Sequence, residues 1–326
     1  MSTLSALAPR LAGQHVAVIG DVMLDHFLIG HVHRLSPEAP VPVVQFARDE
    51  YRLGGAANVA QNIVRLAGQA ALVGLVGEDA AGEELARQLR AASVDGQFLV
   101  VDPSRPTTRK MRIVTTRNQQ VARVDHELDA DASGNALDAL QARIAAATST
   151  ARAIVLSDYR KGVVTPAVIA AAVAAGRRAG VPVLVDPKVA HADRYRGTSL
   201  ITPNHHEAEM MTQMSIRTID EARAAARALH ERTGANVLIT WGEHGMWMLD
   251  ASTTPTVEQA LPAVAREVSD VTGAGDTVIA VLALALASGA TLLDAPRLAN
   301  IAAGLVVARF GPASVTPAEL SDATRA

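Results

Sequence analysis

Short apolar runs rich in Val and Ile alternate along the chain with Ala-rich stretches whose apolar positions recur at helical spacing. The short runs lack polar alternation, which is typical of parallel strands covered on both faces. The expected strands span residues 15–21, 71–77, 151–158, 181–187, 199–204 and 236–242, and the expected helices span residues 56–67, 83–92, 165–179 and 220–233. The pattern predicts an α/β protein, with a doubly wound, mostly parallel sheet, helices on both faces, and ligands at the carboxyl ends of the strands.

Two segments interrupt this rhythm. Residues 30–51 carry three prolines and no helical period, and residues 97–127 alternate polar and apolar positions. We expect both to form antiparallel strands that are inserted in a single domain spanning residues 1–326 and make a small β-strand lid. Because a lid sheet with exposed edges can pair with a second copy of itself, the pattern also predicts a homodimer formed through the lid strands.

Composition narrows the class of protein. The 326 residues include 30 Lys and Arg against 33 Asp and Glu, a formal net charge of −3 that argues against a nucleic-acid binder with a basic surface. There is no cysteine, which excludes disulfides and thiolate metal sites and fits a reducing compartment. The most apolar run, residues 278–287, is about half of the roughly 20 residues that a membrane span needs, so we expect a buried core helix. With no apolar leader at the N-terminus, we expect a soluble, cytoplasmic protein without a membrane partner.

The stretch VTGAGDT, residues 271–277, places two glycines and a carboxylate where a polar loop becomes that apolar helix. N–H groups at a helix N-terminus favour an anion, because they lack helical partners and lie at the positive end of the dipole. Gly273, Ala274 and Gly275 can therefore form an anion hole. Asp276 is either a plain N-cap or a general base beside that hole, which would suit attack of a hydroxyl group on a phosphate.

Two upstream stretches offer polar groups to a hydroxylated ligand. In LGGAANVA, Gly54 and Gly55 precede a helix that has Asn58 in its first turn. They make either a tight turn with a cap, or a close approach of the backbone to a ligand whose hydroxyls Asn58 can bind. In GDVMLD, Asp21 and Asp25 lie at and just after the end of the first strand. A single carboxylate there can be a cap, whereas a pair favours hydroxyl binding.

The stretch TPNHHEAE, residues 202–209, follows another expected strand. Asn204 and Glu207 share one face of a turn and offer the hard oxygen ligands that suit Mg²⁺, which usually keeps several of its waters. The alternative is a zinc site at His205 and His206. Adjacent histidines on a helix point about 100° apart, and no third ligand is evident, so we expect these histidines to be exposed.

Basic residues are the remaining candidates. Lys110 and Arg112 share one face of an expected lid strand, and Arg123 lies on the next one. Lys161 and Lys188 follow two of the core strands. The default interpretation is a solvated charged face, and the alternative is a grip on a substrate phosphate. The chain contains neither a GxxxxGK[ST] loop nor a GxGxxG after a strand, so the common nucleotide-binding fingerprints are absent.

Taken in order, GDVMLD, GGAANVA, TPNHHE and TGAGDT resemble the ribokinase-like (PfkB) family of carbohydrate kinases, over nearly the whole chain from about residue 20 to residue 311. The resemblance implies an α/β core with a small β lid, phosphoryl transfer from ATP, Mg²⁺, and in many members a monovalent cation near the last loops. It implies that Asp276 is the catalytic base and that the anion hole takes the transferring phosphoryl group. The other implied roles are sugar binding by Asp21, Asp25, Gly54, Gly55 and Asn58, substrate-phosphate binding by Lys110, Arg112, Arg123 and Lys161, nucleotide binding by Lys188, Asn204, Glu207, Thr240, Gly242 and Gly245, and organisation of Mg²⁺ through water by Asn204 and Glu207.

A second set of stretches, SPEAPVPV, TTRKMRIV, NQQVARVDHE, SDYRKG, VDPK and FGPASVTPAEL, resembles the heptose 7-phosphate kinases of lipopolysaccharide heptose synthesis. This resemblance implies phosphorylation of the anomeric hydroxyl of D-glycero-β-D-manno-heptose 7-phosphate to the 1,7-bisphosphate, on the way to ADP-heptose. Many such kinases are fused to a nucleotidylyltransferase, but no HxGH-type motif follows here, so we expect a stand-alone kinase. Arg160, within SDYRKG, departs from the smaller residue that is common there.

Two alternatives stay open. One is another PfkB-family kinase that acts on a fructose phosphate, a keto-deoxy sugar acid or a nucleoside. The other, from a different class, is a sugar-phosphate or nucleotide sensor that has lost catalysis.

Overall fold

The computed structural model describes residues 3–188, 192–264, 269–309 and 313–325. Its main sheet has the strand order β14-β13-β12-β11-β10-β9-β1-β4. The strands are β1 (His15–Gly20), β4 (Gln69–Val73), β9 (Ala153–Ser157), β10 (Val183–Asp186), β11 (Leu200–Ile201), β12 (Asn236–Thr240), β13 (Met246–Asp250) and β14 (Val257–Leu261). All neighbours from β4 to β12 are parallel, and β13 and β14 add an antiparallel edge. The predicted mostly parallel sheet is confirmed.

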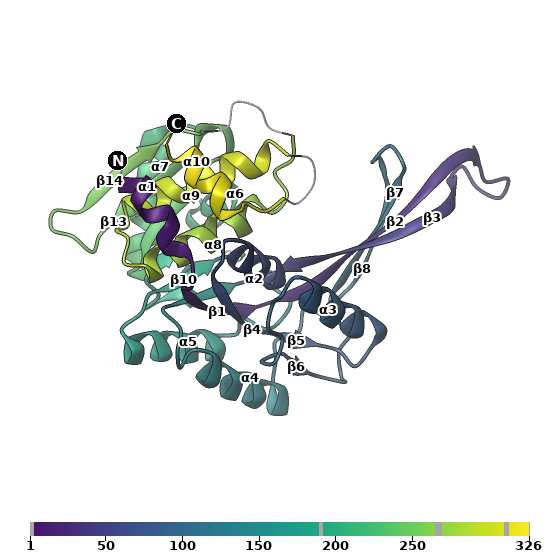
Figure 1. Cartoon of the computed structure of the whole chain (residues 1–326), viewed down its shortest axis with the longest axis horizontal. Helices are drawn as coiled ribbons and strands as arrows, with labels where there is room; N and C mark the ends of the chain where they lie inside the picture. The colour runs from purple at the N-terminus through teal and green to yellow at the C-terminus, as the bar shows by residue number, and fades with distance from the viewer. Residues whose placement is uncertain (1–2, 189–191, 265–268, 310–312, 326) are drawn as a thin grey trace.

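Helices cover both faces of this sheet, as predicted (Figure 1). One face carries α1 (Thr3–Leu7), the 3-10 helix η1 (Ala8–Leu11), α2 (Ala56–Arg65), α3 (Ala80–Ala91), α8 (Ala274–Ala287), α9 (Asp294–Val307) and α10 (Pro317–Ala323), and the other carries α4 (Gly134–Ala147), α5 (Pro166–Ala179), α6 (His205–Thr212) and α7 (Ile219–Thr233). Two 3-10 turns, η2 (Ala192–Tyr195) and η3 (Gly242–His244), complete the set. Strand β1 shows why two cores form: Val16 and Val18 pack into one, and Ala17 and Ile19 into the other.

Helix α8 is the expected buried core helix. Its residues from Ile279 to Ala285 have no exposed surface, and the helix packs against α2, α9 and the central strands. Burial all round is what the uniformly apolar sequence predicts. Because every side of the helix is held, its N-terminus is fixed relative to the ends of the strands. In the part of the chain that the structure describes, no helix combines the length and the apolar character that crossing a membrane requires.

The lid is a four-stranded sheet that projects from the core (Figure 1), with the order β3-β2-β7-β8. Its strands are β2 (Val22–Leu35), β3 (Pro42–Gly55), β7 (Arg109–Thr115) and β8 (Gln120–His126). The two hairpins are antiparallel, but β2 and β7 pair in parallel, which corrects the expectation of a wholly antiparallel lid. Alternation of polar and apolar residues identifies a strand, but it does not identify the strand that pairs with it or the direction of the pairing.

The lid boundaries also differ from those expected. The sheet uses residues 22–55 and 109–126, whereas the predicted segments were 30–51 and 97–127. Strand β2 follows β1 after a single residue, Asp21, so no turn signal marks its start. Residues near 100 form β6 (Val100–Val101), which pairs with β5 (Leu75–Val76) in a separate small sheet.

Candidate active site

A cavity of about 170 Å³ opens where β9, β10, β11 and β12 end, against the N-terminus of α8. This is the edge at which doubly wound sheets bind ligands. The side chains and backbone that line it come from five separate segments: Tyr159, Asp186, Lys188, Thr202, Asn204, Glu207, Thr240, Gly273, Gly275, Asp276 and Val278. The structure therefore brings the TGAGDT and TPNHHE stretches together, as the motif order implied.

Asp276 is the most constrained carboxylate of this cavity. Its side chain is 6% exposed, and its two oxygens accept hydrogen bonds from the Tyr159 hydroxyl at 2.8 Å and from the Asn58 amide at 2.6 Å. Burial raises its pKa to about 6, although the two hydrogen bonds oppose the shift. Gly273 is the N-cap of α8, and no side chain caps this helix, so Asp276 is not the plain N-cap of the simpler interpretation.

The glycines before Asp276 shape the start of the helix. Gly273 has a φ of 78°, a left-handed conformation that favours glycine. A Cβ added at Gly275 would meet no atom within 4 Å, so this glycine leaves open space beside the cavity. The N–H of Ala274 donates to the Val271 carbonyl at 3.2 Å. Of the three predicted anion-hole residues, Gly273 and Gly275 therefore line the cavity, and Ala274 is already engaged by the chain.

Opposite the helix, Asn204 and Glu207 form a reciprocal capping box on α6. The Asn204 side chain accepts from the Glu207 N–H at 3.0 Å, and the Glu207 carboxylate accepts from the Asn204 N–H at 2.9 Å. The second oxygen of Glu207 accepts from Lys188 Nζ at 2.5 Å. Burial opposes the charge on Lys188, but this hydrogen bond leaves its pKa above the ordinary value. The pair that we expected to organise a metal therefore also holds the helix start.

Asp186, at the end of β10, adds a further carboxylate. Burial raises its pKa well above the ordinary value, and the nearby charges of Glu207 and Asp276 raise it further. Within the described residues no donor is bonded to its carboxylate. Three carboxylates with one lysine leave an excess of negative charge and of hard oxygen atoms, which fits a magnesium ion held with its waters. In the described ranges no group of three or more His, Asp or Glu could hold a metal directly.

The zinc alternative gains no support. His206 is exposed, with 75% of its side chain accessible, and the His205 ring lies against it, tilted by 39° with ring centroids 3.8 Å apart. Neither ring lines the cavity. The expectation of an exposed pair of histidines holds for His206, while His205 is partly covered.

The residues predicted to hold sugar hydroxyls divide into two groups. Asn58 and Asp25 lie close to Asp276: the Asn58 amide donates to its carboxylate, and the nearby charge of Asp25 adds to its raised pKa after burial. Asp21 is 1% exposed, and its carboxylate is engaged by the backbone N–H groups of residues 159, 161 and 163. These contacts show Asp21 holding the loop of residues 159–163, and sugar binding by Asp21 stays a prediction. Gly55, with a φ of 58°, lies so close to the Asp21 carbonyl that a Cβ would be 2.3 Å from it.

Gly54 is also constrained by the chain, because an added Cβ would lie 2.8 Å from the Asp25 carboxylate. On the nucleotide side, Thr240 lines the cavity. Gly242 begins the turn η3 and Gly245 caps its end, with φ values of 53° and 86°, and a Cβ on Gly245 would be 2.0 Å from the Leu261 carbonyl. The glycine at 245 is thus required by backbone packing at the sheet edge, and neither of the two lines the cavity.

The predicted phosphate-binding cations are paired with acidic side chains. Arg112 contacts Asp25, and Lys110 lies 3.3 Å from Asp125 and 3.1 Å from Glu127. Strand register places the same residues side by side, since Lys110 pairs with Asp125 across β7 and β8. The other two cations are also engaged: Arg123 with Asp125 at 3.0 Å, and Lys161 with Glu127 at 2.9 Å and Asp129 at 2.7 Å. We refer to Asp25, Lys110, Arg112, Arg123, Asp125, Glu127, Asp129 and Lys161 as the lid charge cluster.

Sequence reasoning gave no role to several residues that line this cavity, among them Tyr159 and Asp186. Both follow or end a buried strand, at the edge where the other candidates lie. Their position at the end of a strand could have identified both as site candidates. It was not decisive, because a tyrosine in a stretch such as SDYRKG and an aspartate before proline are common in loops. Part of the last loops, where a monovalent cation was expected, lies outside the described residues, as does the start of FGPASVTPAEL.

Solved structures of other proteins share the fold of this chain. A ribokinase from Arabidopsis thaliana, solved with ribose and ATP, has a TM-score of 0.73 over 95% of this chain and 98% of its own, at 20% identity. Phosphofructokinase-2 from Escherichia coli, solved with potassium, has a TM-score of 0.76 over 96% of this chain and 98% of its own, at 18% identity. The fold is therefore that of the ribokinase-like enzymes.

The family follows from the sequence. Residues 14–319 match the model described as pfkB family carbohydrate kinase, and the chain belongs to this family of phosphotransferases that use an alcohol group as acceptor. It is 42% identical over 322 residues to the bifunctional protein HldE of Pelobacter propionicus and 47% identical over 321 residues to that of a Caulobacter species. These matches cover 98% of this chain but 65% and 64% of the relatives. The chain thus spans less than two thirds of the length of these proteins.

Proposed function

We propose that this carbohydrate kinase transfers the γ-phosphoryl group of ATP to the anomeric hydroxyl of D-glycero-β-D-manno-heptose 7-phosphate, giving the 1,7-bisphosphate. The observation that carries the kinase chemistry is Asp276, a buried carboxylate with a pKa of about 6 at the N-terminus of a fixed helix. The heptose substrate rests on the resemblance of the lid and loop stretches to heptose 7-phosphate kinases. The relatives are named bifunctional protein HldE, which agrees with a kinase that many organisms carry fused to a second enzyme.

In the proposed reaction, Asp276 takes the proton of the anomeric hydroxyl while the oxygen of that hydroxyl attacks the γ-phosphorus of ATP. The bond between the γ-phosphorus and the oxygen that bridges it to the β-phosphate then breaks, and ADP is released. A base with a pKa near 6 is ionised at neutral pH and still accepts a proton as the bond forms. The first turn of α8 leaves the N–H groups of Gly275 and Asp276 without helical partners, and an anion is favoured beside such groups. Positioning and charge neutralisation supply most of the rate in such transfers.

Mg²⁺ fits the opposite side of the cavity. Asn204, Glu207 and Asp186 would hold the ion through its waters, and the bound ion would neutralise charge that develops on the ATP phosphates. Lys188, bonded to Glu207 at 2.5 Å, reaches the same space and can bind a phosphate oxygen. Thr240 lines the nucleotide side. A monovalent cation near the last loops stays part of the proposal.

The lid charge cluster would bind the 7-phosphate. Arg112 and Lys110 are paired with carboxylates, and a phosphate can take the place of these partners because guanidinium and ammonium groups bind both kinds of anion. Asp25 would then be free to accept a hydrogen bond from a sugar hydroxyl. Its electrostatic contact with Asp276 supports a sugar placed between the lid and the base.

Turnover on a matched set of acceptors tests the substrate. With saturating ATP and Mg²⁺, we expect kcat/KM on heptose 7-phosphate to exceed that on fructose 6-phosphate, a keto-deoxy sugar acid or ribose by about ten- to a hundredfold, since a lost or misplaced charged hydrogen bond removes about 1.5–3 kcal/mol. Equal or greater turnover on another acceptor would contradict the heptose assignment. ATP and sugar-phosphate binding without turnover on any acceptor would favour the sensor.

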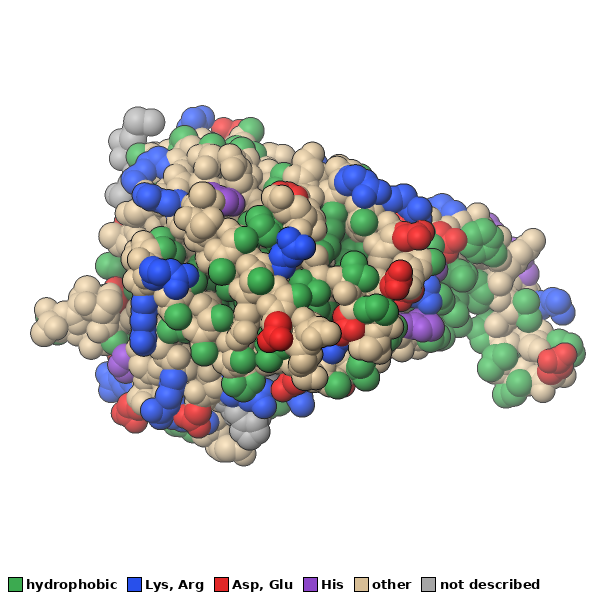
Figure 2. Space-filling model, turned by 90° about the horizontal axis from the view of Figure 1, so that it is seen from below, with side chains coloured by type: hydrophobic (Ala, Val, Ile, Leu, Met, Phe, Trp, Pro, Cys, Tyr) green, Lys and Arg blue, Asp and Glu red, His purple; other side chains and the backbone are tan. Residues whose placement is uncertain are grey.

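We also propose a cytoplasmic homodimer formed through the lid. Supply of ATP supports the location. The far end of the lid carries exposed apolar side chains, Leu35 at 65%, Phe46 at 57% and Val41 at 51%, and Figure 2 shows hydrophobic surface gathered on this projection. Strands β3 and β8 are the edges of its sheet and can pair with another copy. Light scattering should give twice the monomer mass, and Phe46→Glu should give the monomer. A monomeric wild-type protein would contradict this proposal.

A further inference from the structure

The loop that connects β9 to α5 carries a tyrosine to which the proposed reaction gives no role. The hydroxyl of Tyr159 donates to Oδ1 of Asp276 at 2.8 Å, while the Asn58 amide donates to Oδ2 at 2.6 Å. Each carboxylate oxygen has two lone pairs, so one on each stays available for the substrate hydroxyl. We propose that Tyr159 is a positioning residue for the base: its hydroxyl fixes the Asp276 carboxylate in the orientation and the ionised state that proton removal needs. This inference rests on the proposed function of Asp276.

Tyr159 is suited to donate and not to titrate. Burial raises the pKa of its hydroxyl well above the ordinary value, and the nearby charge of Asp276 raises it further. The phenol therefore stays protonated throughout the working range of pH. A donor bonded to a carboxylate stabilises its ionised form, so Tyr159 works against the burial that raises the pKa of Asp276.

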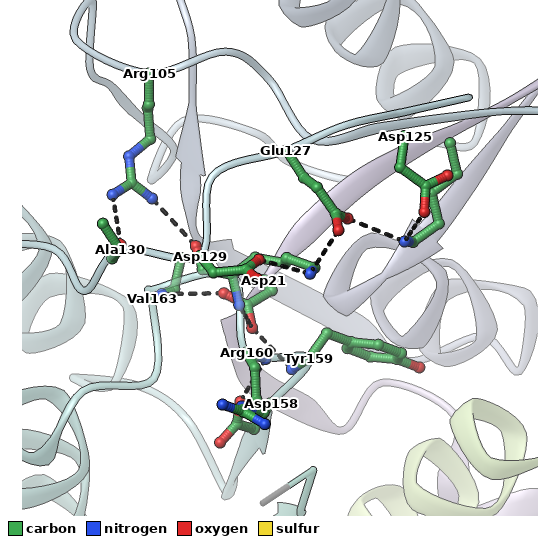
Figure 3. A network of polar contacts seen from close by, with 12 residues as sticks. Asp21, Arg105, Asp125, Glu127, Asp129, Ala130, Asp158, Tyr159, Arg160 and Val163 are labelled. Atoms are coloured by element: carbon green, nitrogen blue, oxygen red, sulfur yellow. Dashed lines mark hydrogen bonds and ion pairs between the residues drawn. The ribbon is translucent and has the colours of Figure 1, made fainter. Parts of the chain in front are cut away.

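The loop under Tyr159 is held rigidly by Asp21. One oxygen of the Asp21 carboxylate accepts the N–H of Tyr159 at 2.7 Å and that of Lys161 at 3.1 Å, and the other accepts the N–H of Val163 at 3.0 Å. Figure 3 shows Asp21 at the centre of this network, with the labelled loop residues around it. Three backbone donors on one buried carboxylate fix the loop at several points, which fixes the direction in which Tyr159 leaves it.

The conformation of Arg160 is further evidence that this loop is held in place by hydrogen bonds. It adopts a left-handed φ of 58°, and its N–H donates to the Asp158 carboxylate at 2.8 Å. A non-glycine residue in this conformation costs free energy, and the surrounding hydrogen bonds hold it there. The backbone thus turns sharply between Tyr159 and Lys161, sending the first side chain to the base and the second to Glu127 of the lid charge cluster.

Because the same loop contacts the base and the lid, a role in folding alone is the alternative, and the test must separate the two. Tyr159→Phe removes one hydroxyl. We expect kcat to fall about tenfold, as for loss of one charged hydrogen bond, with KM for ATP and for the sugar phosphate changed less than about threefold. The acid limb of the pH profile of kcat/KM should move to higher pH by about one unit, since one unit corresponds to 1.36 kcal/mol.

The chain offers a matched control. Tyr195 is fully buried and donates its hydroxyl to Asp158 at 2.7 Å, away from the cavity. Tyr195→Phe should lower the thermal stability as Tyr159→Phe does and leave the acid limb where it is in wild type. If both variants lose stability and neither moves the acid limb, Tyr159 is a structural residue and the proposal is overturned.

A readout without turnover keeps this inference separate from the substrate. In protein labelled with carbon-13 at the aspartate carboxyl carbons, the resonance of Asp276 is the one absent from Asp276→Asn. Its titration midpoint should be higher in Tyr159→Phe than in wild type, and unchanged in Tyr195→Phe. An unmoved midpoint in Tyr159→Phe overturns the inference. If wild type fails to phosphorylate heptose 7-phosphate but the midpoint moves, the substrate proposal fails and the coupling of Tyr159 to Asp276 stands.

Discussion

The cavity at the start of α8 and the lid charge cluster both contain charged side chains, but they hold them in different ways. Asp276 is 6% exposed and is fixed by two donors from distant parts of the core. On the lid, the side chain of Arg112 is 21% exposed and that of Arg123 is 51% exposed, and both contact carboxylates of the lid itself. The cavity is organised by contacts within the chain, whereas the lid cations form ion pairs with carboxylates, and we propose that a phosphate can replace those carboxylates.

This difference follows from where the groups lie. Burial makes each charge in the cavity costly unless it is bonded, so its geometry is fixed and its pKa values are raised. The lid pairs are more exposed than the cavity carboxylates, with Lys110 at 18%, Arg112 at 21% and Arg123 at 51%, so water screens them more than it screens the cavity. We therefore expect changes in the cavity to reduce kcat and changes on the lid to raise KM for the sugar phosphate. The following predictions test this division, from the largest expected effect to the smallest.

Asp276→Asn should lower kcat by about a thousandfold or more while sugar-phosphate binding persists, because it removes a general base and its charge. Steady-state kinetics and calorimetric binding measure the two quantities. Asp220→Asn is the matched control, since Asp220 lies in the first turn of α7 and is exposed. Near-normal turnover in Asp276→Asn would remove this residue from the proposed role.

Glu207→Gln should lower kcat by about ten- to a hundredfold and weaken the dependence on Mg²⁺. Glutamine can keep the capping box with Asn204, so the fold is retained, but the charge that Lys188 meets is lost. Glu221→Gln changes a capping box of the same kind on α7, outside the cavity, and should leave kcat unchanged. Equal losses of thermal stability in the two variants, with activity retained in both, would reduce Glu207 to a helix cap.

Arg112→Ala should raise KM for the sugar phosphate by about tenfold or more, with little effect on KM for ATP, because a bidentate guanidinium contact to phosphate is lost. Arg48→Ala is the control on the same sheet, where Arg48 is exposed and paired with Glu50. High salt should reduce the effect. A fall in kcat with both KM values unchanged would break the division between cavity and lid.

Acid should lower kcat/KM about tenfold at pH 5 relative to the plateau, because protonation of Asp276 follows its pKa of about 6. Unfolding through this group cannot be the cause. Its folded pKa lies above the ordinary value of 3.8, so the stability that it contributes is present below about pH 4 and is lost as pH rises through about 6. A pH profile recorded beside thermal melts checks both statements. An activity that stays flat from pH 7 to pH 5 would contradict the assigned pKa.

Much of the fold was readable from the sequence because it depends on local patterns. Apolar runs without alternation identified the central strands, and uniform apolar character identified α8 as a buried helix. The lid was less predictable. Alternation located its strands, but β2 starts directly after Asp21 and pairs in parallel with β7, and neither fact leaves a local signal.

The candidate site was partly readable for the same reason. Asp276 and Glu207 lie in motifs whose glycine and spacing patterns are local. Asp21 lies in such a motif as well, yet its carboxylate is engaged by backbone N–H groups more than 130 residues away in the sequence (sequence separations of 138, 140 and 142). The GDVMLD motif placed Asp21 at the correct edge of the sheet. It did not decide whether the Asp21 carboxylate binds a ligand or the backbone of the chain.

By itself, the sequence determined the layered architecture and the position of a carboxylate at a helix start, because periodicity and glycine placement constrain backbone conformation directly. The class of chemistry followed from the resemblance of the motifs to those of the PfkB kinases. Only the tertiary structure decided that Asp276 is held by Tyr159 and Asn58, which are 117 and 218 residues away. It also decided that the lid cations are matched by carboxylates. Contacts of this kind depend on strand order and helix packing, which bring together residues that no local pattern connects.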